Sequence, residues 1–217
     1  RILTRVKTGQ QTSFSAELAW DNHGSEYTGS QRLQAHPQFQ HVFTPGDDIE
    51  LHMLGTLDDM KFGRISYELP FIDSAWRIGA TTSRLSYSLG GSAASLQAYG
   101  NASQRSLWLD RSLMQTERMQ VGWRTELERS DLNDLQDVTG ISNQRTLNML
   151  HTRLTARMQG DNFARFQSWF SLGVSAGELW FRDTTADLGD ATYANTQGRF
   201  HKLQLSAGHV QSLSPHV

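Results

Sequence analysis

Apolar and polar residues alternate along most of this chain. Between residues 13 and 20, Phe14, Ala16, Leu18 and Trp20 alternate with serine and glutamate. A period of two is the signature of a β-strand whose two faces meet different surroundings. The same alternation predicts further strands, about ten in all, at residues 27–39, 48–57, 63–69, 76–89, 94–109, 118–129, 147–158, 164–176 and 198–213.

Three segments depart from this regular pattern. Within 76–89 the apolar positions change phase between Ala80 and Leu85, which predicts a β-bulge. The best candidate for a helix is 131–138, a short acidic segment in a polar connector predicted for 130–143. A second long connector is predicted for 178–197.

Strand and connector lengths favour a membrane barrel over a soluble two-sheet sandwich. Several predicted strands reach ten residues or more, which exceeds the usual five or six and approaches the nine to eleven that span a bilayer. Short connectors on one side and long ones on the other are typical of outer-membrane barrels. Aromatic residues near strand ends suit the two interfacial girdles of such a barrel: Trp20, Tyr27, Trp76, Trp108, Trp180, Phe181 and Phe200. We therefore predict an all-β fold, an antiparallel transmembrane β-barrel segment.

Composition excludes several other classes. Only 37% of the residues are hydrophobic, and no run of eighteen apolar residues offers a transmembrane helix. A net charge of -2 without a Lys/Arg-rich run argues against a nucleic-acid partner. Gly90-Gly91 and Gly198 lack the strand-to-helix context of a phosphate loop, so no nucleotide partner is predicted. The absence of cysteine excludes disulfides and thiolate metal sites.

Enzymatic chemistry is the alternative to a transport role. A barrel closed at ten strands would resemble small outer-membrane hydrolases, which carry acidic and histidine residues at the outer mouth. The candidates are Asp21, His23, Asp58, Asp59, Asp183 and Asp187. No motif such as Gly-x-Ser-x-Gly places a nucleophile beside a base, so we predict no enzyme and no catalytic residue. The spacing of His36, His41 and His52 matches no zinc pattern, so we predict no metal ligand and no cofactor.

In a barrel, the polar positions of the alternating strands would face the lumen. A wall of mixed charge forms cross-strand ion pairs and lacks the single-sign ring of an ion-selective filter. Such a wall suits a hydrated conduit for an unfolded polypeptide, with a passive porin as a further alternative. The predicted lumen-facing residues are Arg32, Glu50, His52, Arg64, Glu68, Arg77, Arg124, Glu126, Arg153 and Arg157.

Short motifs follow one another in a fixed order along the chain. Pro-Gly-Asp-Asp occupies 45–48, Ser-Tyr-Glu-Leu-Pro 66–70 and Trp-Arg-Ile-Gly 76–79, with further matches at 83–89 and 198–213. Together with the hairpin at 19–29, they resemble the barrel of two-partner-secretion outer-membrane transporters of the haemolysin activation/secretion type. The residues that match the motifs are Asp21, Asn22, Gly24, Thr28, Gly29, Tyr67, Pro70, Trp76, Arg77 and Gly79.

The resemblance implies the location, the partner and the domain organisation. Members of this family lie in the outer membrane of Gram-negative bacteria, contact its lipid, and export a large haemolysin, adhesin or contact-dependent toxin in unfolded form. A complete member has two periplasmic POTRA domains and about sixteen barrel strands. Residues 1–11 would then be the end of a POTRA domain or a linker, and 12–217 the N-terminal part of the barrel. The Val-Arg-Gly-[Phe/Tyr] motif of the wider family does not occur in this sequence.

Overall fold

A computed structural model describes residues 2–8, 13–57, 60–71, 75–160, 165–193 and 195–212. These residues form one antiparallel sheet of 11 strands whose spatial order is the order of the chain. The sheet is all-β, as the alternation predicts. Its elements are β1 (Ile2–Thr8), β2 (Ser13–Asp21), β3 (Arg32–Gln40), β4 (Asp48–Thr56), β5 (Lys61–Phe71), β6 (Trp76–Ser88), a 3-10 helix η1 (Gly91–Leu96), β7 (Ala98–Gln115), β8 (Met119–Gln136), β9 (Ile141–Gly160), β10 (Phe166–Phe181), α1 (Thr184–Tyr193) and β11 (Gly198–Gln211).

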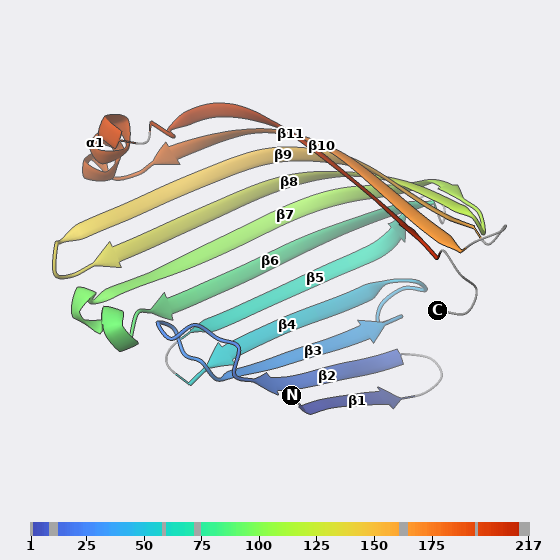
Figure 1. Cartoon of the computed structure of the whole chain (residues 1–217), viewed down its shortest axis with the longest axis horizontal. Coiled ribbons are helices and arrows are strands. Elements are labelled where there is room, and N and C mark those ends of the chain that lie inside the picture. Colours follow the sequence, from blue (N-terminus) through green and yellow to red (C-terminus); the bar gives the residue numbers. More distant parts are fainter. Residues whose placement is uncertain are drawn as a thin grey trace.

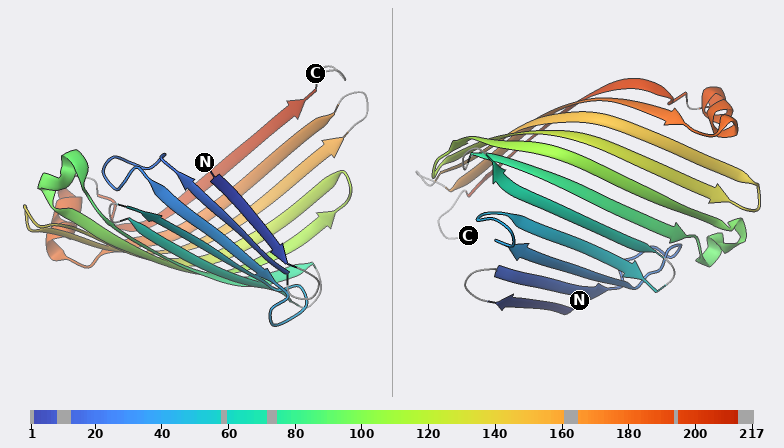
Figure 2. Two further views of the ribbon diagram at one scale, coloured as in Figure 1. Left: turned by 90° about the horizontal axis from the view of Figure 1, so that it is seen from below. Right: turned by 180° about the vertical axis from the view of Figure 1, so that it is seen from behind.

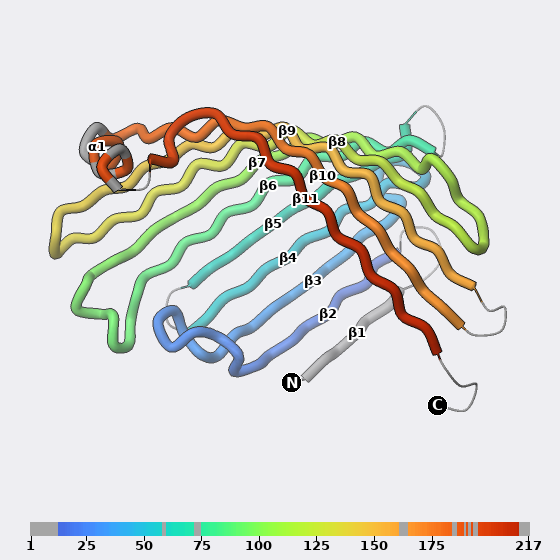
Figure 3. The backbone as a smooth tube through the Cα atoms, turned by 45° about the horizontal axis from the view of Figure 1, so that its top comes forward, coloured from blue at the N-terminus to red at the C-terminus, as the bar shows by residue number. Residues whose placement is uncertain are grey.

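The sheet is strongly twisted and curved (Figures 1 and 2). One end carries η1, the β8–β9 hairpin and the connection through α1 (Figure 3). We name this the loop end; here β2 is followed by β3, β4 by β5, β6 by β7, β8 by β9 and β10 by β11. The opposite end, at which β1 is followed by β2, β3 by β4, β5 by β6, β7 by β8 and β9 by β10, is the turn end.

Register divides the sheet into two faces of opposite character. On one face a continuous row of partners joins Gly79, Trp108, Glu126, His151 and Ser175. We call this the polar face. On the other, the apolar face, a neighbouring row joins Tyr67, Ala80, Leu107, Leu127, Leu150 and Ala176.

The apolar face is the uncovered one. Leu107 and Leu127 are 63% and 59% exposed, whereas Trp108, between them in the sequence and on the polar face, is 7% exposed. Among the described residues, the buried hydrophobic side chains are Ala19 and Trp108. A contiguous exposed aliphatic surface of this kind requires a non-aqueous covering.

The number of strands is one higher than predicted from the alternation. The additional strand is β1, which pairs with β2 from Ile2↔Trp20 to Thr8↔Phe14. The backbone of residues 2–8 is thus continuous with the sheet. Its assignment to the end of a POTRA domain or a linker stays a prediction.

Two local predictions are wrong. β6 contains no bulge, because its register with β5 and β7 is unbroken from Trp76 to Ser88. A register shift occurs instead in β7, between Ser112 and Met114. The segment 131–138 is not helical, since Asp131–Gln136 continues β8 and the connector shrinks to 137–140. Its acidic side chains find partners across the sheet, as in the 2.7 Å ion pair between Asp134 and Arg145.

The helix in the second long connector is α1. No helix among the described residues is long and apolar enough to cross a membrane. The aromatic girdle prediction also needs correction, because Trp108 lies on the polar face. Phe200 also lies on the polar face, because it pairs with Gly177, which in turn pairs with Met149, two residues from the polar-face residue His151 on β9.

Candidate functional site

All ten residues predicted to face the lumen lie on the polar face. Arg77 opposes Asp110, which opposes Arg124, which opposes Arg153. Residues that are paired across strands, or that lie two apart on one strand, share a face of the sheet. By this rule the other predicted positions lie on the same face as this row. Charged residues that were not predicted also belong to this face: Glu17, Asp21, Asp48, Asp110, Glu128, Asp134, Arg145 and Lys202. The face is therefore mixed in charge, as expected.

Ion pairs connect neighbouring strands across this face. Arg32 lies 2.8 Å from Asp21, and Arg124 lies 3.8 Å from Asp110. Arg77 pairs with Glu68 of the adjacent strand. Cross-strand pairs of this type stabilise a sheet by roughly 0.2–1 kcal/mol each, and the groups that they engage are less available to bind a passing chain.

Trp108 is a closely packed side chain on the polar face, 7% exposed. The guanidinium of Arg124 lies over its ring at 3.9 Å from the centroid. Beneath the ring lies Gly79, where an added Cβ would stand 2.2 Å from Trp108. The motif residue Gly79 is thus explained by the close approach of an aromatic ring from β7.

Histidines on this face make contacts within the sheet. His151 Nδ1 lies 2.7 Å from the hydroxyl of Ser175, and its Nε2 accepts a hydrogen bond from Arg153 at 3.2 Å. His36 and His52 stack with ring centroids 3.9 Å apart. No group of three or more His, Asp or Glu side chains suited to a metal ion occurs among the described residues.

At the turn end, motif residues converge on the turn 41–47. The carboxylate of Asp47 is 1% exposed and accepts hydrogen bonds from the backbone amides of Val42, Phe43 and Thr44 at 2.7, 2.9 and 3.0 Å. Burial by itself would raise the pKa of Asp47. The hydrogen bonds outweigh it and hold the pKa below its ordinary value of 3.8.

Three motif residues of β5 and β6 fix this turn to the sheet. Tyr67 donates its hydroxyl to Asp47 at 3.1 Å, and Arg77 donates to the carbonyl of Gly46 at 3.3 Å. Gly46 adopts a φ of 89°, and Pro70 lies against it. The sequence motifs at 45–48, 66–70 and 76–79 therefore describe one structural unit.

At the loop end, a second group of motif residues closes the connector 22–31. Asp21 accepts hydrogen bonds from the amide of His23 at 3.0 Å and from Arg32 Nε at 2.9 Å. Gly24 donates its amide to the carbonyl of Ser30 at 2.9 Å. The carbonyl of Thr28 accepts a 2.5 Å hydrogen bond from Thr56, so the connector is held against β4.

The candidate hydrolase residues that the structure describes are not assembled into a catalytic group. Asp21 is engaged with Arg32 and its own turn. Asp183 and Asp187 lie one helical turn apart at the start of α1, joined by a 3.0 Å backbone hydrogen bond. Asp58 and Asp59 lie outside the described residues. Within the described part of the chain, the arrangement supports a structural role for Asp21.

Comparison with known proteins agrees with the motifs. The family model for the haemolysin secretion/activation proteins ShlB/FhaC/HecB matches residues 4–216. The heme/hemopexin transporter protein HuxB of Haemophilus influenzae strain KW20 is 27% identical over 177 residues, which cover 80% of this chain and 31% of the relative. HuxB of strain 86-028NP is 27% identical over 146 residues, 67% of this chain and 26% of the relative. The chain thus spans under a third of these relatives. No solved structure matches it.

Proposed function

Because this chain belongs to the family of haemolysin secretion/activation proteins ShlB/FhaC/HecB, we propose that it forms part of the wall of an outer-membrane pore. The pore exports a partner polypeptide, in unfolded form, by two-partner secretion. The chain contributes strands of a transmembrane barrel and carries out no catalysis. Family membership is the basis for placing it in the outer membrane of a Gram-negative bacterium.

The observation that carries the proposal is the opposition of the two faces. Exposed leucines such as Leu107 and Leu127 cover the apolar face, while ion-paired side chains such as Arg124 and Asp110 cover the other. In the strands of outer-membrane barrels, apolar side chains face outward to lipid and polar side chains face inward to the lumen. In this arrangement the apolar face meets lipid and the ten predicted polar residues line the lumen.

The mixed charge of the polar face matches the demands of a polypeptide conduit. A translocating chain carries both signs of charge and must move without strong binding at any point. Asp110 lies between Arg77 and Arg124 in the row that continues to Arg153, so a carboxylate interrupts the cations of this row. Internal pairing of these groups also lowers their availability to the passenger.

A crosslinking experiment on the intact protein that contains this chain tests the proposal. Gln104 and Leu107 lie three residues apart on β7 and on opposite faces. A photo-crosslinking amino acid at 104 is expected to capture a partner polypeptide stalled during secretion, whereas the same group at 107 captures lipid. Equal capture from both positions, or secretion of the partner after deletion of the gene, would overturn the proposal. Stable ohmic conductance without any dependence on a partner would favour a porin instead.

A further inference from the structure

Four cationic residues cross the apolar face on adjacent strands. They are Lys61 on β5, Arg84 on β6, Arg105 on β7 and Arg129 on β8, and all four are exposed. We name this set the cation row. Register places them on the apolar face, because Arg105 opposes Thr82 and Arg129, in the row next to that of Leu107 and Leu127.

Strand tilt brings the cation row to one depth in a membrane. Barrel strands tilt by about 35–45°, so positions at equal depth shift by roughly one residue per strand. The turn end shows this stagger. The last paired residue at the turn end lies progressively farther from the register row of Arg105. The separation is three residues in β4 (Leu51 to Asp48), six in β6 (Thr82 to Trp76), ten in β8 (Arg129 to Met119) and twelve in β10 (Glu178 to Phe166).

The cation row follows the same slope. Relative to the register row of Arg105, Lys61 lies four residues nearer the loop end and Arg84 two, while Arg129 lies level with Arg105. At the turn end, the ends of the strands shift by about three residues for every two strands crossed. The positions of the four cations follow the same shift to within about one residue. The four cations therefore lie at one level parallel to the membrane plane.

The same level marks a change in the surface of the apolar face. On the turn-end side of it, the outward positions are aliphatic, as at Leu107 and Leu127. On the loop-end side they are polar, at Ser86, Ser103, Asp131 and Asn133. This reversal also explains the phase change in β6 without a bulge. The cation row thus lies where the apolar band ends.

Most of this positive charge is not neutralised by the sheet. Arg129 lies 3.4 Å from Asp131. Within the part of the chain that the structure describes, no carboxylate forms an ion pair with Lys61, Arg84 or Arg105. Exposed guanidinium groups without carboxylate partners are well suited to phosphate, which they bind through two parallel hydrogen bonds.

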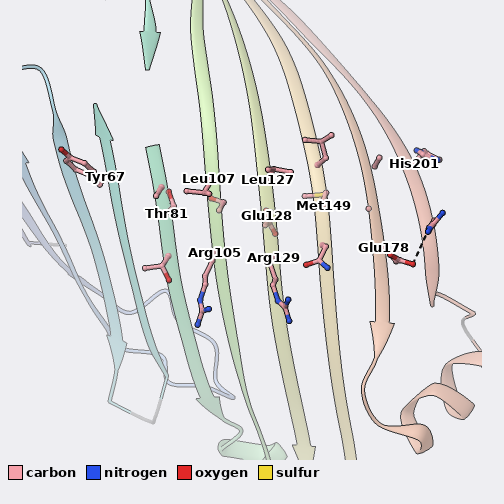
Figure 4. Close-up of a pocket in the computed structure, with 18 of the residues that line it drawn as sticks. Tyr67, Thr81, Arg105, Leu107, Leu127, Glu128, Arg129, Met149, Glu178 and His201 are labelled. Atoms are coloured by element: carbon pink, nitrogen blue, oxygen red, sulfur yellow. Dashed lines mark ion pairs between the residues drawn. The ribbon is translucent and has the colours of Figure 1, made fainter. Parts of the chain in front are cut away.

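An apolar depression adjoins the cation row. It has a volume of about 920 Å³ and is lined by Leu107, Leu127 and Leu150 together with Arg105 and Arg129. Figure 4 shows the two arginines side by side, with Leu107 and Leu127 farther from the loop end. The depression would accommodate acyl chains directly beside the charged groups.

We propose that the cation row and this depression bind the lipopolysaccharide of the outer leaflet, with its lipid A phosphates on the arginines and its acyl chains over the leucines. The inference rests on the proposed function, which sets the apolar face in the outer membrane. It also places the loop end outside, because outer-membrane barrels carry their longer loops on the extracellular side. The row crosses three inter-strand spacings and four residues along the strands, about 20 Å from end to end. This span fits a disaccharide that carries two phosphates better than the single phosphodiester of a phospholipid.

Thermal unfolding of the intact protein in detergent, titrated with defined lipids, tests the proposal. The probes are lipopolysaccharide, the same material after enzymatic dephosphorylation, and phosphatidylglycerol. Lipopolysaccharide is expected to raise the unfolding midpoint, and the other two to have much weaker effects. In the triple variant Lys61→Gln/Arg84→Gln/Arg105→Gln, the apparent affinity for lipopolysaccharide is expected to fall on the order of 100-fold, since each cation contributes about 1 kcal/mol near an anionic surface.

Two controls separate charge from fold. Arg84→Lys/Arg105→Lys keeps the charge and is expected to retain most of the affinity. Arg64→Gln/Arg153→Gln/Arg157→Gln removes three charges from the polar face and is expected to leave lipid affinity unchanged. An equal response to dephosphorylated lipopolysaccharide, to phosphatidylglycerol, or in the cation-row triple variant would overturn the proposal. Should that variant not fold, the comparison of the three lipids on the unmodified protein decides. Secretion of the partner, measured separately, reports on the proposed function alone.

Discussion

The hydroxyl of Tyr67 donates a 3.1 Å hydrogen bond to the buried carboxylate of Asp47 and thereby ties the turn 41–47 to strand β5. The two residues come from separate sequence motifs. The same carboxylate also accepts hydrogen bonds from three backbone amides of the turn. Asp47 is therefore the centre of the unit that joins the motifs at the turn end of the sheet.

Replacement of this carboxylate is expected to loosen the turn. Asp47→Asn removes the charge that strengthens four hydrogen bonds, so the thermal unfolding midpoint of the intact protein should fall at pH 7. Asp48→Asn is the matched control, because Asp48 accepts one side-chain hydrogen bond, from Gln38 at 2.7 Å. Equal midpoints for the two variants would show that Asp47 does not organise the turn.

The same site predicts a pH dependence. The pKa of Asp47 is lowered in the folded protein, so the folded state binds fewer protons than the unfolded state. Its contribution to stability is complete above the ordinary pKa of 3.8 and is lost as the pH falls from there through the lowered pKa. The difference in midpoint between the unmodified protein and Asp47→Asn should therefore shrink below pH 3.8. A difference that grows on acidification would contradict this sign.

The lack of space between Gly79 and the Trp108 ring predicts a second effect on stability. Gly79→Ala places a Cβ 2.2 Å from the Trp108 ring, and overpacking of this kind costs about 1–3 kcal/mol. Gly63 lies on the apolar face with nothing within 4 Å of an added Cβ, so Gly63→Ala should change the free energy of unfolding by less than about 0.5 kcal/mol. Urea unfolding from lipid vesicles measures both. Equal costs would mean that the close approach of Trp108 is unimportant.

Charge on the apolar face should be far less tolerated than loss of charge on the polar face. Leu51 lies on the apolar face of β4, opposite Ile65 and close to mid-depth by the stagger of the sheet. Leu51→Arg is expected to cost roughly 2–4 kcal/mol of unfolding free energy in lipid vesicles. Arg64→Leu, on the polar face of β5, should cost much less. Similar costs at the two positions would count against a membrane setting.

The connector with α1 offers a local prediction. Asp190 accepts hydrogen bonds from the hydroxyl and amide of Thr196 at 2.6 and 2.7 Å and from the amide of Gln197 at 2.9 Å. Asp190→Ala should increase the hydrogen-exchange rate of both amides, while those of central β8 keep their protection. Unchanged exchange at Thr196 and Gln197 would exclude this role.

Alternation was sufficient to predict the strands because each face meets a uniform environment over many residues. It failed at residues 131–136, where polarity is high on both faces. There Asp131 pairs with Arg182, and Asp134 pairs with Arg145, partners that are distant in the sequence. It also failed in β6, because the outward positions become polar at Arg84, where the apolar band ends.

The faces of the predicted polar residues followed from period two, but their closest contacts did not. Its position near a strand end suggests that Trp108 is a girdle residue. The strand register instead places its ring over Gly79, a residue 29 positions earlier on the neighbouring strand. The role of Asp47 likewise depends on the approach of Tyr67 and Arg77 from β5 and β6. Such contacts arise from strand pairing, which local sequence patterns do not specify.

A membrane barrel wall is tested most directly by finding which face of the sheet meets lipid. Single fluorescent labels at positions 124, 125, 126, 127 and 128 of β8, in the intact protein reconstituted in vesicles, can be probed with acyl-chain-brominated lipids. Quenching is expected at 125 and 127, on the apolar face, and little quenching at 124, 126 and 128, on the polar face. Quenching without alternation, or alternation in the opposite phase, would contradict the membrane barrel wall.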